Sequence, residues 1–145
     1  MIYTPLTNKA IDLAYEYHHG QKDKAGRPYI VHVLHVAEQM DDEFSACAAL
    51  LHDTLEDTEL SPEVLEREFP REVVEAVKLL THQEGTDYFE YVRRVAQNPI
   101  ARKVKRADLA HNLDISRFDM CAESLVESAR KRSNKYLEAL RVLQD

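Results

Sequence analysis

The chain has 145 residues, of which 44% are hydrophobic, so it can bury a core without help from a metal or a disulfide. A formal net charge of -7 argues against a general surface for nucleic acids or anionic membranes. Only 3 Gly and 5 Pro interrupt runs of Ala, Leu, Glu, Lys and Arg, which favours an all-α fold over a sheet. We therefore expect residues 1–145 to form a single compact helical bundle.

The sequence also indicates a cellular setting. Cys47 and Cys121 lie far apart and form no CxxC pair, which is typical of a reduced compartment. The N-terminal stretch lacks the basic and apolar regions of a signal peptide, and no segment is apolar over the length that a membrane helix requires. We expect a soluble, unprocessed, cytoplasmic protein that binds neither nucleic acid nor membrane, and the sequence is compatible with a homo-oligomer.

Apolar spacing and capping residues predict a series of helices. Thr7 or Asn8 is expected to cap a first helix that ends near Tyr17, and a second helix is expected from Ile30 to about Met40. The loop between them, HHGQKDKAGRPYIVH, is rich in lysine and arginine and would suit an anionic ligand. Taken alone, this loop is explained more simply as a solvated lysine-rich turn.

The later helices are predicted in the same way. Ser61 followed by Pro62 is a helix start, and Pro70 interrupts the apolar run that comes next. The stretch THQEGTDY is predicted to be a loop that ends in a Thr or Asp cap, and an Asn-Pro pair breaks the chain after the following helix. The last helix is expected over residues 122–143.

Chemistry is indicated most strongly by residues 46–58, ACAALLHDTLEDT. The apolar first half predicts a buried helix, which we expect to continue without a break to the end of this stretch. At about 100° per residue, Glu56 and Asp57 return nearly to the face of Asp53. With His52 beside them, one helix gathers an imidazole and three carboxylates, which repel one another unless a divalent cation lies between them. The stretch therefore predicts a metal site with a spare carboxylate to handle water.

A histidine and an aspartate elsewhere in the chain would complete such a site. His32 and His35 both lie on the second predicted helix, and their spacing does not decide which of them faces the metal. Asp108 shares one side of a later helix with Lys105 and Asn112. Taken alone, that side is explained more simply by an ordinary amphipathic helix with a weak Lys–Asp pair.

Together these residues resemble the HD phosphohydrolase superfamily, whose members bind a divalent metal through the pattern H…HD…D. Three longer motifs are similar to the hydrolase domain of Rel/SpoT-type alarmone enzymes and their stand-alone small hydrolase relatives. They are GRPYIVH…VA at 26–37, ALLHDTLEDT at 49–58 and VKRADLAHN at 104–112. The resemblance covers residues 10 to about 143. It implies one HD-type metal-dependent phosphohydrolase domain over 1–145, without the synthetase domain of the long enzymes.

The resemblance also implies roles for individual residues. The metal ligands would be His32, His52, Asp53 and Asp108. The pair that orients and deprotonates the attacking water would be Glu56 and Asp57. The substrate would be bound by Lys22, Lys24, Lys105, Asn112, Arg132 and Tyr136. The single divalent metal of this family is usually manganese, which suits a shell of imidazole and carboxylate ligands.

Two positions depart from the family pattern. Asp23 stands where the long enzymes typically carry an arginine, in a loop that reads GQKDKAG, and Val33 replaces a proline that often follows the metal histidine. An aspartate repels phosphate, whereas Lys22 and Lys24 beside it offer compensating charge. The catalytic positions match the family, so the sequence predicts the reaction class and leaves the substrate open.

Three functional hypotheses follow. The leading one is a metal-dependent pyrophosphohydrolase that removes the 3′-diphosphate from guanosine 3′,5′-bis(diphosphate) or its triphosphate analogue, giving GDP or GTP and pyrophosphate. Asp23 favours an alternative in which the same site acts on another phosphorylated nucleotide, such as a 2′- or 3′-phosphorylated dinucleotide cofactor or a nucleoside monophosphate. A third is a nucleotide-sensing module without turnover, which the presence of Glu56 and Asp57 argues against. A helical structural protein would require all three motifs to be coincidences.

Overall fold

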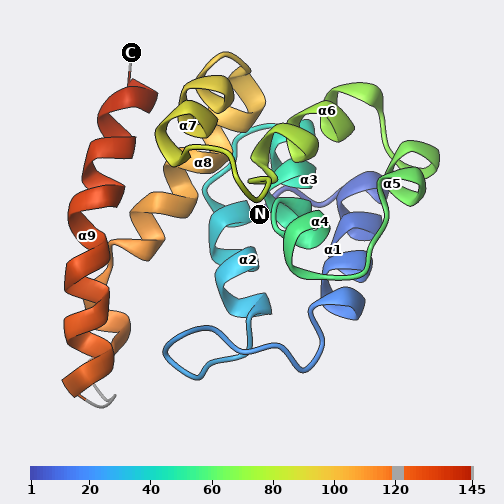
Figure 1. Cartoon of the computed structure of the whole chain (residues 1–145). Coiled ribbons are helices and arrows are strands. Elements are labelled where there is room, and N and C mark those ends of the chain that lie inside the picture. The colour runs from blue at the N-terminus through green and yellow to red at the C-terminus, as the bar shows by residue number, and fades with distance from the viewer. Residues whose placement is uncertain (119–122, 145) are drawn as a thin grey trace.

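A computed structural model describes residues 1–118 and 123–144, and within these ranges the chain is helical and contains no strand (Figure 1). This confirms the predicted all-α class. The elements in chain order are α1 (Pro5–Tyr17), α2 (Ile30–Glu38), α3 (Glu43–Leu51), α4 (Thr54–Asp57), α5 (Pro62–Glu68), α6 (Arg71–Leu80), α7 (Tyr88–Ala96), α8 (Pro99–Asn112), the 3-10 helix η1 (Ile115–Phe118) and α9 (Glu123–Gln144).

Helix α3 lies at the centre of the fold. Every side chain from Ser45 to Leu51 is buried, and a helix that is apolar on all sides needs neighbours on all sides. The helix packs against α1, α2, α6 and α8, which surround it in Figure 1. A fully buried leucine such as Leu50 contributes roughly 1.5–3 kcal/mol relative to exposure. This packing fixes the end of α3, where His52 follows.

Local signals set where the helices begin. The prediction that Thr7 or Asn8 caps α1 is wrong, because Thr4 and Thr7 exchange hydrogen bonds with each other's backbone and Pro5 takes the first helical position. Four later helices, α3, α5, α7 and α8, each begin after a side chain that accepts the backbone N–H three residues on. These caps are Asp42, Ser61, Asp87 and Asn98.

The prediction of an unbroken helix over residues 46–58 is also wrong, because α3 ends at Leu51 and α4 starts after a two-residue turn. The Thr54 hydroxyl donates to the Leu51 carbonyl at 2.7 Å, and His52 Nδ1 donates to the Ala49 carbonyl at 2.6 Å. Carbonyls at the end of a helix lack intrahelical partners, so these side chains stabilise the break.

Helix α9 forms one edge of the fold, on the opposite side of the view from α1 in Figure 1. It packs against α7, α8 and η1. The predicted start of this helix at residue 122 and the predicted free Cys121 lie outside the described residues, whereas Cys47 is a buried free thiol in α3. Among the residues that the structure describes, no helix combines the length and apolarity needed to span a bilayer.

Candidate metal centre

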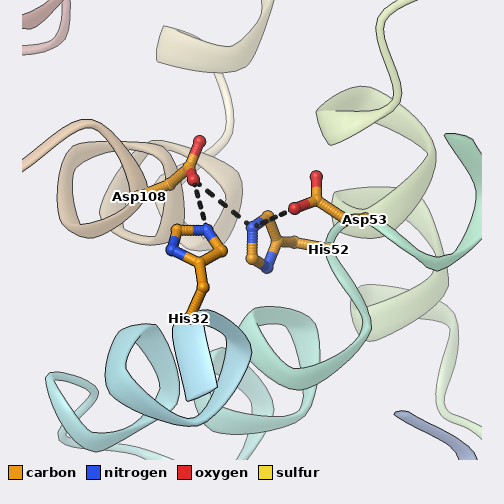
Figure 2. Close-up of side chains that lie close together, drawn as sticks. All are labelled: His32, His52, Asp53 and Asp108. Atoms are coloured by element: carbon orange, nitrogen blue, oxygen red, sulfur yellow. Dashed lines mark hydrogen bonds and ion pairs between the residues drawn. The ribbon is translucent and has the colours of Figure 1, made fainter. Parts of the chain in front are cut away.

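The four predicted metal ligands come from three separate parts of the chain and meet at one point (Figure 2). His32 lies on α2, His52 and Asp53 form the turn after α3, and Asp108 lies on α8. His32 Nε2 lies 2.9 Å from Asp108 Oδ1. His52 Nε2 lies 2.9 Å from Asp53 Oδ2 and 3.5 Å from Asp108 Oδ1. One potential ligand atom from each of the four lies within 4.8 Å of the others.

The surroundings of the His52 ring show whether these residues fit a cation. Because its Nδ1–H donates to the Ala49 carbonyl, the neutral ring carries a lone pair on Nε2. This Nε2 is buried, makes no hydrogen bond and faces carboxylate oxygens of Asp53 and Asp108. Lone pairs that face one another in a buried place are unfavourable, and a positive charge between them removes the conflict. The residues therefore fit a divalent metal ion.

A proton takes this place in the metal-free protein. Burial alone would lower the pKa of His52, but the carboxylates of Asp53 and Asp108 outweigh burial and raise this pKa well above its ordinary value. Burial would raise the pKa of Asp53, whereas the adjacent His52 imidazolium lowers it to about 2. Metal binding therefore displaces a proton, and metal affinity falls as the pH falls.

Asp108 is held by two residues that were predicted to bind the substrate. Lys105 Nζ lies 2.9 Å from Asp108 Oδ2, and Asn112 donates to Asp108 Oδ1 at 3.2 Å. Burial would raise the pKa of Asp108, but the Lys105 ammonium lowers it well below its usual range. Asp108 thus remains an ionised carboxylate in a site where its side chain is only 6% exposed.

Tyr29 is a member of this site that the sequence analysis missed. Its hydroxyl donates to Asp53 Oδ2, and its ring lies 4.9 Å from that of His18 and 5.5 Å from that of His32, measured between centroids. Burial, followed by the nearby Asp53 carboxylate, raises the pKa of Tyr29 well above its ordinary value, so the hydroxyl remains a donor. The available signal was its position one turn before His32.

Glu56 and Asp57, the predicted catalytic pair, lie on α4 next to Asp53. One carboxylate oxygen from each of these three residues lies within 4.8 Å of the others. The backbone N–H of His82 donates to Glu56 Oε1 at 2.6 Å and holds this side chain in place. Partial burial raises the pKa of Glu56, and partial burial together with Asp53 and Glu56 raises that of Asp57 to about 6. A carboxylate with a pKa near neutrality suits proton transfer from water.

Asp57→Asn is expected to stabilise the metal-free protein. The pKa of Asp57 is about 6 in the folded state and ordinarily 3.8, so between these values the folded state binds more protons than the unfolded state. The free energy of unfolding of the wild type therefore falls as the pH rises through this interval. The Asp57→Asn variant has no carboxylate at this position and does not lose stability in this way. Because much of the Asp57 side chain is also exposed to solvent, which screens the repulsion, we expect a gain of only about 1 kcal/mol at neutral pH.

Thermal unfolding of the metal-free wild type and the Asp57→Asn variant measures this effect. We expect the variant to unfold at a higher temperature at neutral pH, and the difference to shrink toward pH values of about 4. A difference that does not depend on pH would contradict the assigned pKa of Asp57.

One cavity of about 380 Å³ contains this chemistry. Three of the four candidate ligands, His32, Asp53 and Asp108, reach its wall, together with Glu56 and Asp57. The fourth, His52, is buried and does not line the cavity. All six predicted substrate-binding residues also line the cavity, namely Lys22, Lys24, Lys105, Asn112, Arg132 and Tyr136.

The basic part of the cavity joins the loop before α2 to α9. Burial, then the positive charges of Arg132 and Lys135, lower the pKa of Lys24. Lys24 of the loop therefore lies close enough to Arg132 and Lys135 of α9 to be repelled by their positive charges. Such a cluster favours an anionic ligand, which would relieve the repulsion.

Asp23, the acidic residue of this basic loop, pairs with Arg117 of η1. The two side chains are 3.0 Å apart and only 7% and 13% exposed, respectively. Asp23 also accepts the backbone N–H groups of Ala25 and Arg27, which closes the loop. Its negative charge is thus compensated by Arg117, a cavity residue that the sequence analysis missed. The expectation that Asp23 simply repels phosphate does not take this partner into account.

The fold and the cluster define an all-helical domain with a His/Asp metal centre. The HD domain family matches residues 10–116, and the chain belongs to this family. HD domains bind divalent metals, in agreement with the four-residue cluster of this structure.

Two relatives show which kind of HD protein this chain resembles. The chain is 37% identical to a GTP pyrophosphokinase of Streptomyces coelicolor, over 76% of this chain and 14% of that protein. It is 32% identical to a guanosine-3′,5′-bis(diphosphate) 3′-pyrophosphohydrolase of Aquifex aeolicus, over 72% of this chain and 17% of that protein. The chain thus spans less than a fifth of either relative. These matches confirm the predicted resemblance to Rel/SpoT-type enzymes.

A solved structure is similar along nearly the whole chain. It is described as a metazoan ortholog of SpoT that hydrolyzes ppGpp and plays a role in starvation responses. The match has a TM-score of 0.75 and 25% sequence identity, and it covers 97% of this chain and 88% of that one. Its high coverage of both chains confirms the compact helical fold.

Proposed function

We propose that this protein is a metal-dependent pyrophosphohydrolase that removes the 3′-diphosphate from guanosine 3′,5′-bis(diphosphate) or its triphosphate analogue. The observation that carries this proposal is a single cavity in which a His/Asp metal cluster and two carboxylates of raised pKa lie together with a cluster of cations. The names of the Aquifex relative and of the metazoan structure support the same substrate. The Streptomyces relative is named for pyrophosphate transfer, and this chain matches only 14% of it.

The metal would be held by His32, His52, Asp53 and Asp108. We propose manganese, because a mixed shell of imidazole and carboxylate ligands suits this ion. When bound, the ion supplies Lewis-acid chemistry, which polarises a phosphoryl oxygen and lowers the pKa of water.

The chain's own residues would perform the proton transfer. Glu56 is fixed by the His82 backbone N–H, and Asp57 lies beside it with a pKa of about 6, so the pair can orient a water and accept its proton. The water oxygen would form a bond to the phosphorus nearest the ribose, and the bond from that phosphorus to the ribose 3′-oxygen would break. The ribose oxygen would then take up a proton, and pyrophosphate and GDP or GTP would leave.

The cationic side chains would bind the phosphates of the substrate. Lys22, Lys24 and Arg132 line the cavity and offset the negative charge that grows on phosphate during the reaction. Tyr136 lines the same cavity from α9, and Lys105 and Asn112 approach from α8. We further propose that residues 1–145 act as one domain on a small-molecule nucleotide in the cytoplasm.

A hydrolysis screen with manganese tests the substrate. The panel contains guanosine 3′,5′-bis(diphosphate), a 2′-phosphorylated nicotinamide dinucleotide and several nucleoside monophosphates, with pyrophosphate and phosphate measured separately. We expect pyrophosphate from the alarmone alone. Phosphate release from another nucleotide would support metal-dependent hydrolysis but would contradict the proposed substrate. Tight nucleotide binding without any turnover would favour the sensing module instead.

A further inference from the structure

A third histidine lies beside the metal cluster and is not explained by the roles assigned so far. His111 on α8 has its Nδ1 atom 2.7 Å from Nδ1 of His32, with the two ring planes 16° apart. His35 stacks on the His111 ring, with centroids 4.0 Å apart. His35 itself therefore packs on His111, whereas His32 is the histidine of α2 that reaches the cluster.

Metal binding determines which ring nitrogen of His32 and of His111 carries a proton. Without a metal, His32 Nε2–H donates to the Asp108 carboxylate, which can only accept, whereas a metal ligand must present a lone pair at Nε2. With the metal bound, the one N–H of the neutral His32 ring is therefore on Nδ1, the ring nitrogen that lies away from Asp108 in Figure 2. The two Nδ1 atoms lie 2.7 Å apart, so in the metal-bound protein this N–H would donate to His111 Nδ1, and His111 would accept with its own proton on Nε2.

We propose that His111 is a positioning residue, which accepts the Nδ1–H of His32 and so fixes the tautomer and orientation in which His32 Nε2 binds the metal. The inference rests on the metal-binding part of the proposed function and does not depend on the identity of the nucleotide. α8 would then supply one ligand directly, Asp108, and support a second ligand through a residue one turn later. Loss of such a supporting partner typically weakens metal affinity by about 10–100-fold.

Two substitutions separate hydrogen bonding from packing. In His111→Asn, the side-chain oxygen takes the place of Nδ1 and can still accept the His32 proton, whereas the similarly sized side chain of His111→Leu cannot accept it. His35→Leu is the matched control, because it removes a ring stacked on His111 and leaves the hydrogen bond to His32 intact.

The experiment is a manganese titration of the metal-stripped full chain without nucleotide, by calorimetry, with thermal unfolding of each variant as a check on folding. We expect manganese to bind His111→Leu about 10–100-fold more weakly than the wild type, and His111→Asn and His35→Leu within about threefold of it. Equal weakening in the Asn and Leu variants, or no weakening in either, would overturn the proposal. So would a loss in His35→Leu as large as that in His111→Leu.

These outcomes are distinct from a failure of the proposed substrate. A wild type that binds manganese but hydrolyses no alarmone would contradict the substrate and leave the comparison of His111 variants intact. A wild type that binds no manganese would overturn the metal centre and the role of His111 together.

Discussion

Asp53→Ala is expected to abolish metal binding and turnover together. Asp53 supplies the carboxylate nearest to His52 Nε2, at 2.9 Å, and accepts the Tyr29 hydroxyl. Its removal leaves three of the four candidate ligands and takes one negative charge from the cluster. We expect manganese affinity to fall by at least about 100-fold and pyrophosphate release to fall to the background rate.

Calorimetric titration with manganese and a pyrophosphate assay measure the two effects on the same preparation. Asp12→Ala is the matched control, because it removes an exposed carboxylate of α1 and should leave both quantities unchanged. Circular dichroism shows whether each variant is folded. Normal manganese affinity in a folded Asp53→Ala variant would remove Asp53 from the set of metal ligands.

Glu56→Gln is expected to reduce turnover while leaving manganese binding nearly unchanged. The substitution keeps the shape of the side chain and an oxygen that can accept the His82 backbone N–H, but it removes one of the two carboxylates that orient the water and take its proton. Manganese affinity should therefore stay within about threefold of the wild type, and turnover should fall by about 10²–10⁴-fold.

The control for this variant is Glu59→Gln, which changes an exposed glutamate just beyond α4. Single-turnover rates at saturating manganese and nucleotide exclude effects on binding from the comparison. Full activity of Glu56→Gln would show that Glu56 has no part in proton transfer, and loss of manganese binding would assign it to the metal centre instead.

The positions of most helices could be predicted because their signals are local. Apolar spacing and the predicted caps at Ser61 and Asp87 depend on residues only a few positions apart. The break after Leu51 was not predicted, because helical periodicity treats residues 46–58 as one pattern. Periodicity carries no information on the hydrogen bonds from the His52 and Thr54 side chains to the backbone carbonyls at the end of α3.

For the candidate site, the proposed metal ligands could be predicted, but the contacts around them could not. The four proposed ligands were identified through motif resemblance, whereas spacing alone left His32 and His35 equal. The contacts around them were not predictable, because they join residues far apart in the chain. His32 and His111 are separated by 79 positions, and Asp23 and Arg117 by 94. The packing of α2 against α8 brings the two histidines together, and the contact of the loop before α2 with η1 brings Asp23 to Arg117.

The central claim is that water attacks the phosphorus next to the ribose 3′-oxygen in a metal-dependent reaction. The most direct measurement is the reaction of the wild-type protein with guanosine 3′,5′-bis(diphosphate) in ¹⁸O-labelled water, with and without manganese, followed by mass spectrometry of the products. We expect one ¹⁸O atom in pyrophosphate, none in GDP, and no product without metal. Label in inorganic phosphate, or equal turnover without metal, would contradict the claim.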